Sequence, residues 1–214
     1  VWVAAMRGLS PKGGQWDLAT GKVVGAVHLW GESLPALLVW WAGAAGMGWL
    51  IRRALLPDAR YGGVIQLGLG AAAHLLVGWL MGWAGLLGPW SAWLVCVAGG
   101  LVLVWQLTAR GRDNFNFEQW PAPPWTLLLL LPVTGLLLVA TTCPPGTIWA
   151  VESYGYNVLS YHLQLPKEWL ANGAIGGLEH NVHSYLPKLV EAGYMQLGAL
   201  RGSIYTAIYT AQMW

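Results

Sequence analysis

Long hydrophobic runs separated by short polar breaks dominate the chain. The apolar windows lie at Ser33–Ile51, Tyr61–Leu87, Trp90–Leu107 and Trp125–Thr142. Because a helix rises about 1.5 Å per residue, about 20 apolar residues cross a hydrocarbon core of about 30 Å. Each window is therefore predicted to form a transmembrane helix. A further apolar helix is predicted from Pro187 to Leu200, interrupted at Arg201 and resumed to Trp214.

This pattern predicts an all-α fold, a polytopic transmembrane helical bundle of about five spans with short interfacial helices in one exterior loop. Four parts follow from it: a surface or interfacial stub at 1–25, four transmembrane helices in 26–142, an exterior loop with juxtamembrane helices at 143–188, and a fifth transmembrane helix in 189–214. The chain begins at Val1 and ends within an apolar stretch, so we expect it to be incomplete.

Proline and glycine positions refine the expected helix boundaries. Pro132 lies within the fourth apolar window and is expected to kink its helix. Pro166 disfavours helix at Leu165 and is suited to the first position of a helix. That helix is expected to end at Asn172-Gly173, where glycine can adopt the left-handed cap.

Composition agrees with a membrane protein. Only 9% of residues are charged and 56% are hydrophobic, and the mean hydropathy is +0.50. A soluble domain carries about 25% charged residues. The net charge of +2 is scattered, which argues against nucleic-acid binding because that requires a basic patch. Cys96 and Cys143 are expected at different depths, so both are interpreted as free thiols.

Basic residues predict the orientation. Five arginines fall in two short loops between the apolar windows, namely Arg52, Arg53, Arg60, Arg110 and Arg112. By the positive-inside rule these loops are cytoplasmic, which places the loop 143–188 on the exterior side of the membrane. Arg7, Lys12 and Lys22 in the N-terminal stub argue against this orientation.

Two features of the second window concern helix contacts. Gly78-x-x-x-Gly82 and Gly68-x-x-x-Ala72 have the small-residue spacing that lets helix backbones approach closely, either within the chain or with another subunit. His74 lies near the middle of the same window. Because ionisable side chains inside a membrane often have a functional role, His74 is a candidate functional residue. The alternative is that His74 is a neutral imidazole that hydrogen-bonds to a neighbouring helix.

Residues 152–191 form the long polar and aromatic stretch in this otherwise apolar chain. It contains Tyr156-Asn-Val-Leu-Ser-Tyr-His-Leu-Gln-Leu-Pro-Lys167, then Gly173-Ala-Ile175 and His180-Asn-Val-His-Ser-Tyr-Leu-Pro187. This segment resembles the large exterior loop of bacterial GT-C-type glycosyltransferases, in particular family-39-like membrane proteins. In those relatives a Tyr-Asp-x-Leu-x-Tyr-His-Leu-x-Leu-Pro-Lys run leads to Gly-x-Ile and Asn-x-Tyr-Ser-x-x-Pro.

The resemblance implies transfer of a sugar from a polyprenyl-phosphate donor to an acceptor at the outer face of the membrane. Such transfer needs a carboxylate to accept the proton of the attacking hydroxyl, and cationic or hydrogen-bonding groups around the departing phosphate. Asn157 occupies the position of the expected Asp, and an amide cannot act as a general base. The groups that could substitute are Glu152, Glu191 and His162.

The remaining candidates concern binding. Lys167 is the expected phosphate partner, and a solvated lysine is the alternative. Tyr156, Tyr161, His183 and Glu191 are further candidates for substrate binding, and the tyrosines are otherwise interfacial aromatics. No cofactor is expected, since Glu179, His180 and His183 give only a weak indication of a divalent metal site.

A different class of function remains open, that of a non-catalytic structural subunit in a larger membrane complex. Asn157 replaces the catalytic Asp, extra spans precede the loop, and the chain stops about one span after it. The expected partners are membrane lipids in both cases. If the protein is an enzyme, a polyprenyl-phosphate-linked sugar is a further expected partner. If its role is structural, the further partners are other membrane protein subunits.

Overall fold

The computed structural model describes residues 15–57, 62–109, 128, 131–141, 161–186 and 188–204, together with positions 207, 210 and 214. Six α-helices and one short 3₁₀ helix lie in these residues: α2 (Gln15–Leu55), α3 (Gly62–Trp83), α4 (Pro89–Ala109), α5 (Leu131–Ala140), α6 (Gln164–Asn172), η6 (Val182–Tyr185) and α7 (Leu189–Arg201). The described part of the chain contains no β-strand beyond one isolated bridge, so the expected all-α fold is confirmed.

Three of these helices are long and apolar enough to cross a membrane. They are the Val27–Leu55 part of α2, α3 and α4. By length and composition the chain is therefore a helical membrane protein. The fourth apolar window is represented by α5, which has 10 residues, and most of the rest of that window lies outside the described residues. The last apolar helix, α7, ends after 13 residues at Gly202, whose φ of 83° is the left-handed glycine conformation.

Several helix boundaries differ from the sequence prediction. Helix α2 begins at Gln15, so residues expected in the N-terminal stub continue into the first long helix. Pro132 is the second residue of α5, where a proline loses no intrahelical hydrogen bond, and the expected kink is not tested because residues 129–130 lie outside the described residues. For the same reason Pro166 is tolerated as the third residue of α6, so Leu165 is helical. The predicted cap is confirmed, since Gly173 has a φ of 76°.

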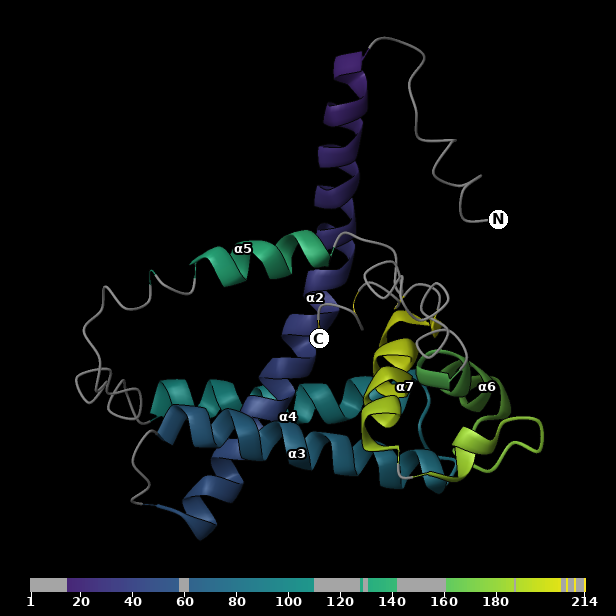
Figure 1. The fold of residues 1–214 in the computed structure, drawn as a ribbon. Helices are drawn as coiled ribbons and strands as arrows, with labels where there is room; N and C mark the ends of the chain where they lie inside the picture. The colour runs from purple at the N-terminus through teal and green to yellow at the C-terminus, as the bar shows by residue number, and fades with distance from the viewer. Residues whose placement is uncertain are drawn as a thin grey trace.

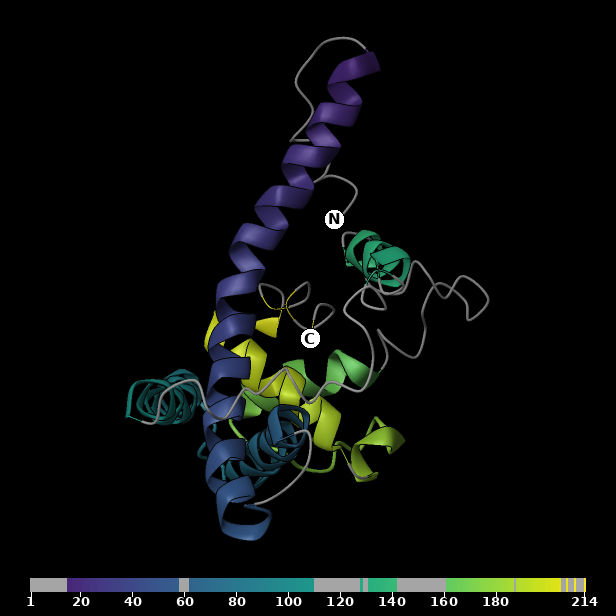
Figure 2. The same ribbon diagram turned by 90° about the vertical axis from the view of Figure 1, so that its left-hand side faces the viewer.

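Helices α3 and α4 run in similar directions and both cross α2 (Figure 1), which lies between them when they are viewed end-on (Figure 2). Glycines allow this close crossing. A Cβ atom at Gly48 of α2 would lie 1.8 Å from the carbonyl oxygen of Gln66, and one at Gly70 of α3 would lie 1.9 Å from that of Ala44. On the other side, a Cβ at Gly46 would lie 1.8 Å from the Gly99 oxygen of α4. Backbone therefore packs on backbone at both crossings.

The buried face of α3 repeats every fourth residue, at Gln66, Gly70, His74, Gly78 and Gly82. Gly78 faces the Gln196 side chain of α7, and Gly82 faces Ile175 and Met195. The Gly78-x-x-x-Gly82 pair thus packs within the chain. By contrast, a Cβ at Gly68 would meet nothing within 4 Å, and Ala72 is exposed.

Polar side chains join the three long helices in their interior. Gln66 Nε2 donates to Gln106 Oε1 and to the Ala45 carbonyl, both at 2.9 Å, and Gln106 Nε2 donates back to Gln66 Oε1 at 3.3 Å. His74 Nε2 lies 3.5 Å from Cys96 Sγ on α4. The imidazole therefore contacts a neighbouring helix, as the simpler alternative for His74 predicted, and Cys96 is a buried free thiol.

Replacing Gln66 by leucine is expected to destabilise the bundle by about 1 kcal/mol, because the change leaves the buried Gln106 amide without its partner. The Q66L/Q106L double variant is expected to lose less than the sum of the two single changes, since neither amide is then orphaned. Thermal unfolding of all four proteins in detergent measures this coupling. Strict additivity of the two changes would contradict it.

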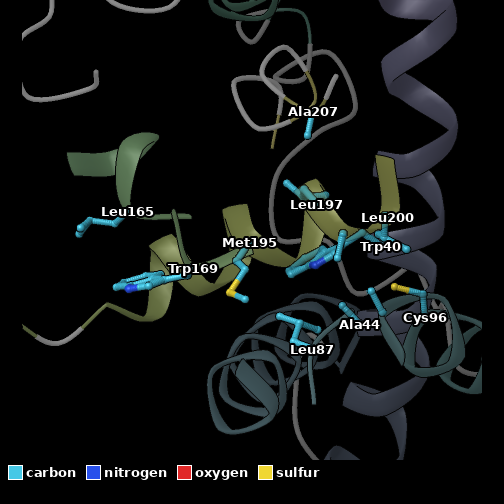
Figure 3. Packing of buried hydrophobic residues seen from close by; sticks show 12 residues of the cluster. Trp40, Ala44, Leu87, Cys96, Leu165, Trp169, Met195, Leu197, Leu200 and Ala207 are labelled. Atoms are coloured by element: carbon cyan, nitrogen blue, oxygen red, sulfur yellow. The ribbon is translucent and has the colours of Figure 1, made fainter. Parts of the chain in front are cut away.

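The apolar core continues from the long helices into the shorter ones. It runs from Leu165 and Trp169 of α6 through Met195, Leu197 and Leu200 of α7 to Trp40 and Ala44 of α2 (Figure 3). Gln196 connects these layers, because it accepts a hydrogen bond from Trp40 Nε1 at 2.9 Å and donates one to the His74 carbonyl at 3.0 Å. Helices α6 and α7 therefore pack against the long helices through a shared core.

Candidate functional site

The polar segment packs at the C-terminal end of α3. The Ile175 backbone N–H donates to the Gly82 carbonyl at 2.8 Å, and residues 175–177 and 184–186 line a groove together with Trp79 and Trp83. Arg52 contacts Gly62 at the opposite end of the same helix. The described part of the polar segment and the basic end of α2 therefore lie at opposite ends of a helix long enough to span a membrane.

A buried carboxylate and an imidazole form the centre of the site. His162 Nδ1 lies 2.6 Å from Glu191 Oε1. Glu191 is buried, whereas about a third of the His162 side chain is exposed (35%). Glu191 lies in the first turn of α7, where unpaired backbone N–H groups favour a negative charge. Glu191 is thus held in the core, whereas the imidazole of His162 is accessible to a second molecule.

The Tyr161 ring lies beside this pair and contacts two further groups, His183 and Lys188. Its ring centroid lies 4.0 Å from that of His162 and 4.5 Å from that of His183, which is stacked on it. The Lys188 ammonium lies 4.6 Å from the Tyr161 centroid, within the range of a cation–π contact. We call these five residues, Tyr161, His162, His183, Lys188 and Glu191, the histidine–glutamate cluster.

Lys188 connects this cluster to a groove on the surface. The groove has a volume of about 490 Å³ and is lined by Trp79, Trp83, Ile175, Gly176, Gly177, Ser184, Tyr185, Leu186 and Lys188. Its walls are mainly apolar and aromatic, and among the described residues that line it Lys188 is the one cation. Lys188 itself is buried (6% exposed), so its charge is little screened by water.

The chemistry available to the cluster is acid–base catalysis beside an anion site. A carboxylate that accepts a hydrogen bond from one imidazole nitrogen orients the ring and leaves the other nitrogen able to accept a proton. An ammonium group with little access to water attracts phosphate oxygens. The arrangement therefore combines a candidate base, a candidate phosphate partner and an apolar groove.

A second acid–histidine pair lies on the outer side of α6. His180 Nε2 is 2.9 Å from Glu168 Oε2, and Gln164 also donates to the Glu168 carboxylate. The Gln164 hydrogen bond, followed by the hydrogen bond and charge of His180, holds the pKa of Glu168 below its usual value. Because this pair is exposed, we interpret it as a link between α6 and the following loop.

His180 and His183, the two histidines of the possible metal site, contact different residues. His180 pairs with Glu168, whereas His183 stacks on Tyr161. Over the described residues, no group of three or more His, Cys, Asp or Glu side chains could hold a metal ion.

The structure brings together four of the residues predicted from sequence, namely Tyr161, His162, His183 and Glu191. Glu152, Tyr156 and Asn157 lie outside the described residues. Lys167 is half-buried in the first turn of α6, and the cluster takes its ammonium from Lys188 instead. Sequence reasoning missed Lys188, although a lysine directly after Pro187 and before an apolar helix indicates a charge at a helix start.

Comparison of the chain with protein-family models, with curated proteins and with solved structures finds no match. The geometry of the histidine–glutamate cluster and the sequence of residues 152–191 are therefore the features that indicate what the chain does.

Proposed function

We propose that this membrane protein is a GT-C-like transferase that passes a sugar from a polyprenyl-phosphate donor to an acceptor at the outer face of the bacterial inner membrane. The observation that carries the proposal is the pair of His162 and buried Glu191 beside Lys188, at the edge of an apolar groove. The resemblance of the segment containing this pair to the exterior loop of such enzymes supports the same reaction.

In the proposed reaction the acceptor hydroxyl attacks the anomeric carbon of the donor sugar. The bond between that carbon and the phosphate oxygen breaks, and the polyprenyl phosphate leaves with the electron pair. With Nδ1 of His162 donating to Glu191, Nε2 accepts the hydroxyl proton. Lys188 stabilises the negative charge of the leaving phosphate. Asn157 has no acid–base role in this scheme, because its amide is not basic.

The surroundings of the cluster suit a lipid-linked donor. Trp79 and Trp83 end a helix long enough to span the membrane, and tryptophan favours the depth of the lipid head groups. The groove that they line lies at this end of α3 and includes Lys188. A polyprenyl chain in the bilayer can therefore bring its phosphate to Lys188 without leaving the lipid.

Changing Lys188 to glutamine is expected to weaken donor binding by about tenfold or more, because it removes a charge-assisted contact to phosphate. Binding and turnover of a synthetic polyprenyl-phosphate sugar by the purified protein test this. The same change at Lys167 is the matched comparison, since it removes a lysine of the same segment outside the cluster. A loss with K167Q and none with K188Q would contradict the role of Lys188.

The rival function, a structural subunit of a larger membrane complex, is favoured by one feature of α3. Gly68 has open space around it and Ala72 is exposed, so this small-residue pair has no partner among the described residues. Cross-linking in native membranes and the turnover assay separate the two functions. No donor turnover by the native protein, together with turnover gained by Asn157→Asp, would favour the structural subunit.

A further inference from the structure

A buried arginine lies at the end of α3 opposite the histidine–glutamate cluster. Arg52, in the last turn of α2, has only 8% of its surface exposed. Its guanidinium lies directly against the first residue of α3. A Cβ atom at Gly62 would be 2.7 Å from Arg52 Nη1 and 3.7 Å from Nε.

The charge of Arg52 has no counter-charge in the described part of the chain. Its Nε is buried and has no hydrogen-bond partner, and Arg52 takes part in none of the ion pairs found between described residues. The neighbouring Arg53 differs, because it is exposed and its guanidinium lies 5.4 Å from the centroid of the Trp49 ring. The carbonyls at the end of α2 attract both arginines, so they do not explain why one of them is buried.

The helix that Arg52 meets adds positive potential at the same point. The first turn of α3 contains no acidic residue, and the backbone N–H groups at a helix N-terminus carry partial positive charge. A buried charge without a partner is strongly destabilising. A guanidinium held against a helix N-terminus is therefore expected to be stabilised by an anion that contacts both of them.

We propose that Arg52 and the first backbone N–H groups of α3 form a binding site for a phosphate group. Gly62 and Gly63 have no side chains of their own that would separate an anion from this backbone. Arginine suits the site because its fork of N–H groups can bind two phosphate oxygens at once. Arg52 and Gly62 lie at the adjoining ends of two helices long enough to span a membrane, the depth at which lipid head groups are found. The phosphate therefore comes from an anionic lipid or from solution. This site is independent of the proposed transferase activity.

The intact protein in detergent tests the site with two probes, phosphatidylglycerol and inorganic phosphate. Native mass spectrometry and thermal unfolding report binding, with phosphatidylcholine as the zwitterionic comparison. Arg52→Gln is expected to weaken binding of the effective probe by about tenfold or more. Arg53→Gln is the matched control and should bind like the native protein.

The two probes distinguish the sources of phosphate. Stabilisation by phosphatidylglycerol alone assigns the site to a lipid head group, and stabilisation by inorganic phosphate assigns it to a free ion. Because R52Q could fail to fold, the native protein provides a second test. If neither probe stabilises it, the counter-charge comes from elsewhere in the chain, for example from Asp58, and the proposal is overturned. An equal response of native and R52Q proteins overturns it as well.

Discussion

Glutamine in place of Glu191 is expected to reduce the rate of sugar transfer by about 10²–10⁴-fold, the usual contribution of general acid–base catalysis. The substitution keeps the size of the side chain and its ability to hydrogen-bond His162, but it removes the negative charge that stabilises a protonated imidazole. The loss should therefore fall on kcat, with little change in the KM for the donor. Initial rates over a range of donor concentrations separate the two constants.

Glu179 provides the matched control for this change. It is an exposed carboxylate in the same polar segment, outside the cluster. Glu179→Gln should leave both kinetic constants close to those of the native protein. Equal activity of native and E191Q proteins would remove Glu191 from the mechanism and with it the proposed function of the pair.

Alanine in place of Gly70 is expected to disrupt the bundle. The added Cβ would lie 1.9 Å from the Ala44 carbonyl oxygen, so α2 and α3 must separate. Overpacking typically costs about 1–3 kcal/mol, and a clash with backbone at this distance belongs at the upper end of that range or beyond it. The thermal unfolding temperature in detergent, together with the fraction of aggregated protein on size-exclusion chromatography, measures the loss.

Gly68→Ala isolates the steric effect. Gly68 lies on the same helix, and a Cβ there would meet nothing within 4 Å. Both substitutions give the same gain in helix propensity, so the difference between them reports only the crossing with α2. Similar unfolding temperatures for the two variants would mean that the helices do not cross at Gly70. If G68A instead weakened association with other proteins in the membrane, it would favour the structural-subunit function.

The hydropathy pattern predicted the long helices well because a bilayer demands about 20 apolar residues in a row whatever the side chains pack against. Helices α3 and α4 begin and end within a few residues of their apolar windows. The exact boundaries depend on local chemistry that is easy to misjudge. Pro166 is expected to be the first residue of its helix and is the third, still within the first turn, where its missing N–H has no cost.

The candidate site was predicted residue by residue but not as an arrangement. His162 and Glu191 each stood out as an ionisable group in a polar segment. Their contact depends on how α7 packs beneath the loop, and no local pattern specifies such a long-range pairing. The same is true of Lys188 and Arg52, whose burial follows from neighbouring helices and not from their own sequence context.

The position of α2 between α3 and α4 has a consequence for biogenesis. Since α2 is synthesised first, its glycine-lined surface faces lipid until both later helices have entered the bilayer and closed around it. A hairpin of α3 and α4 that pairs with itself prematurely would leave no room for α2. A chain that leaves the ribosome before α4 is complete is therefore expected to expose the Gly43–Gly46 surface of α2 to lipid. Such an intermediate would be a target for membrane quality-control proteases.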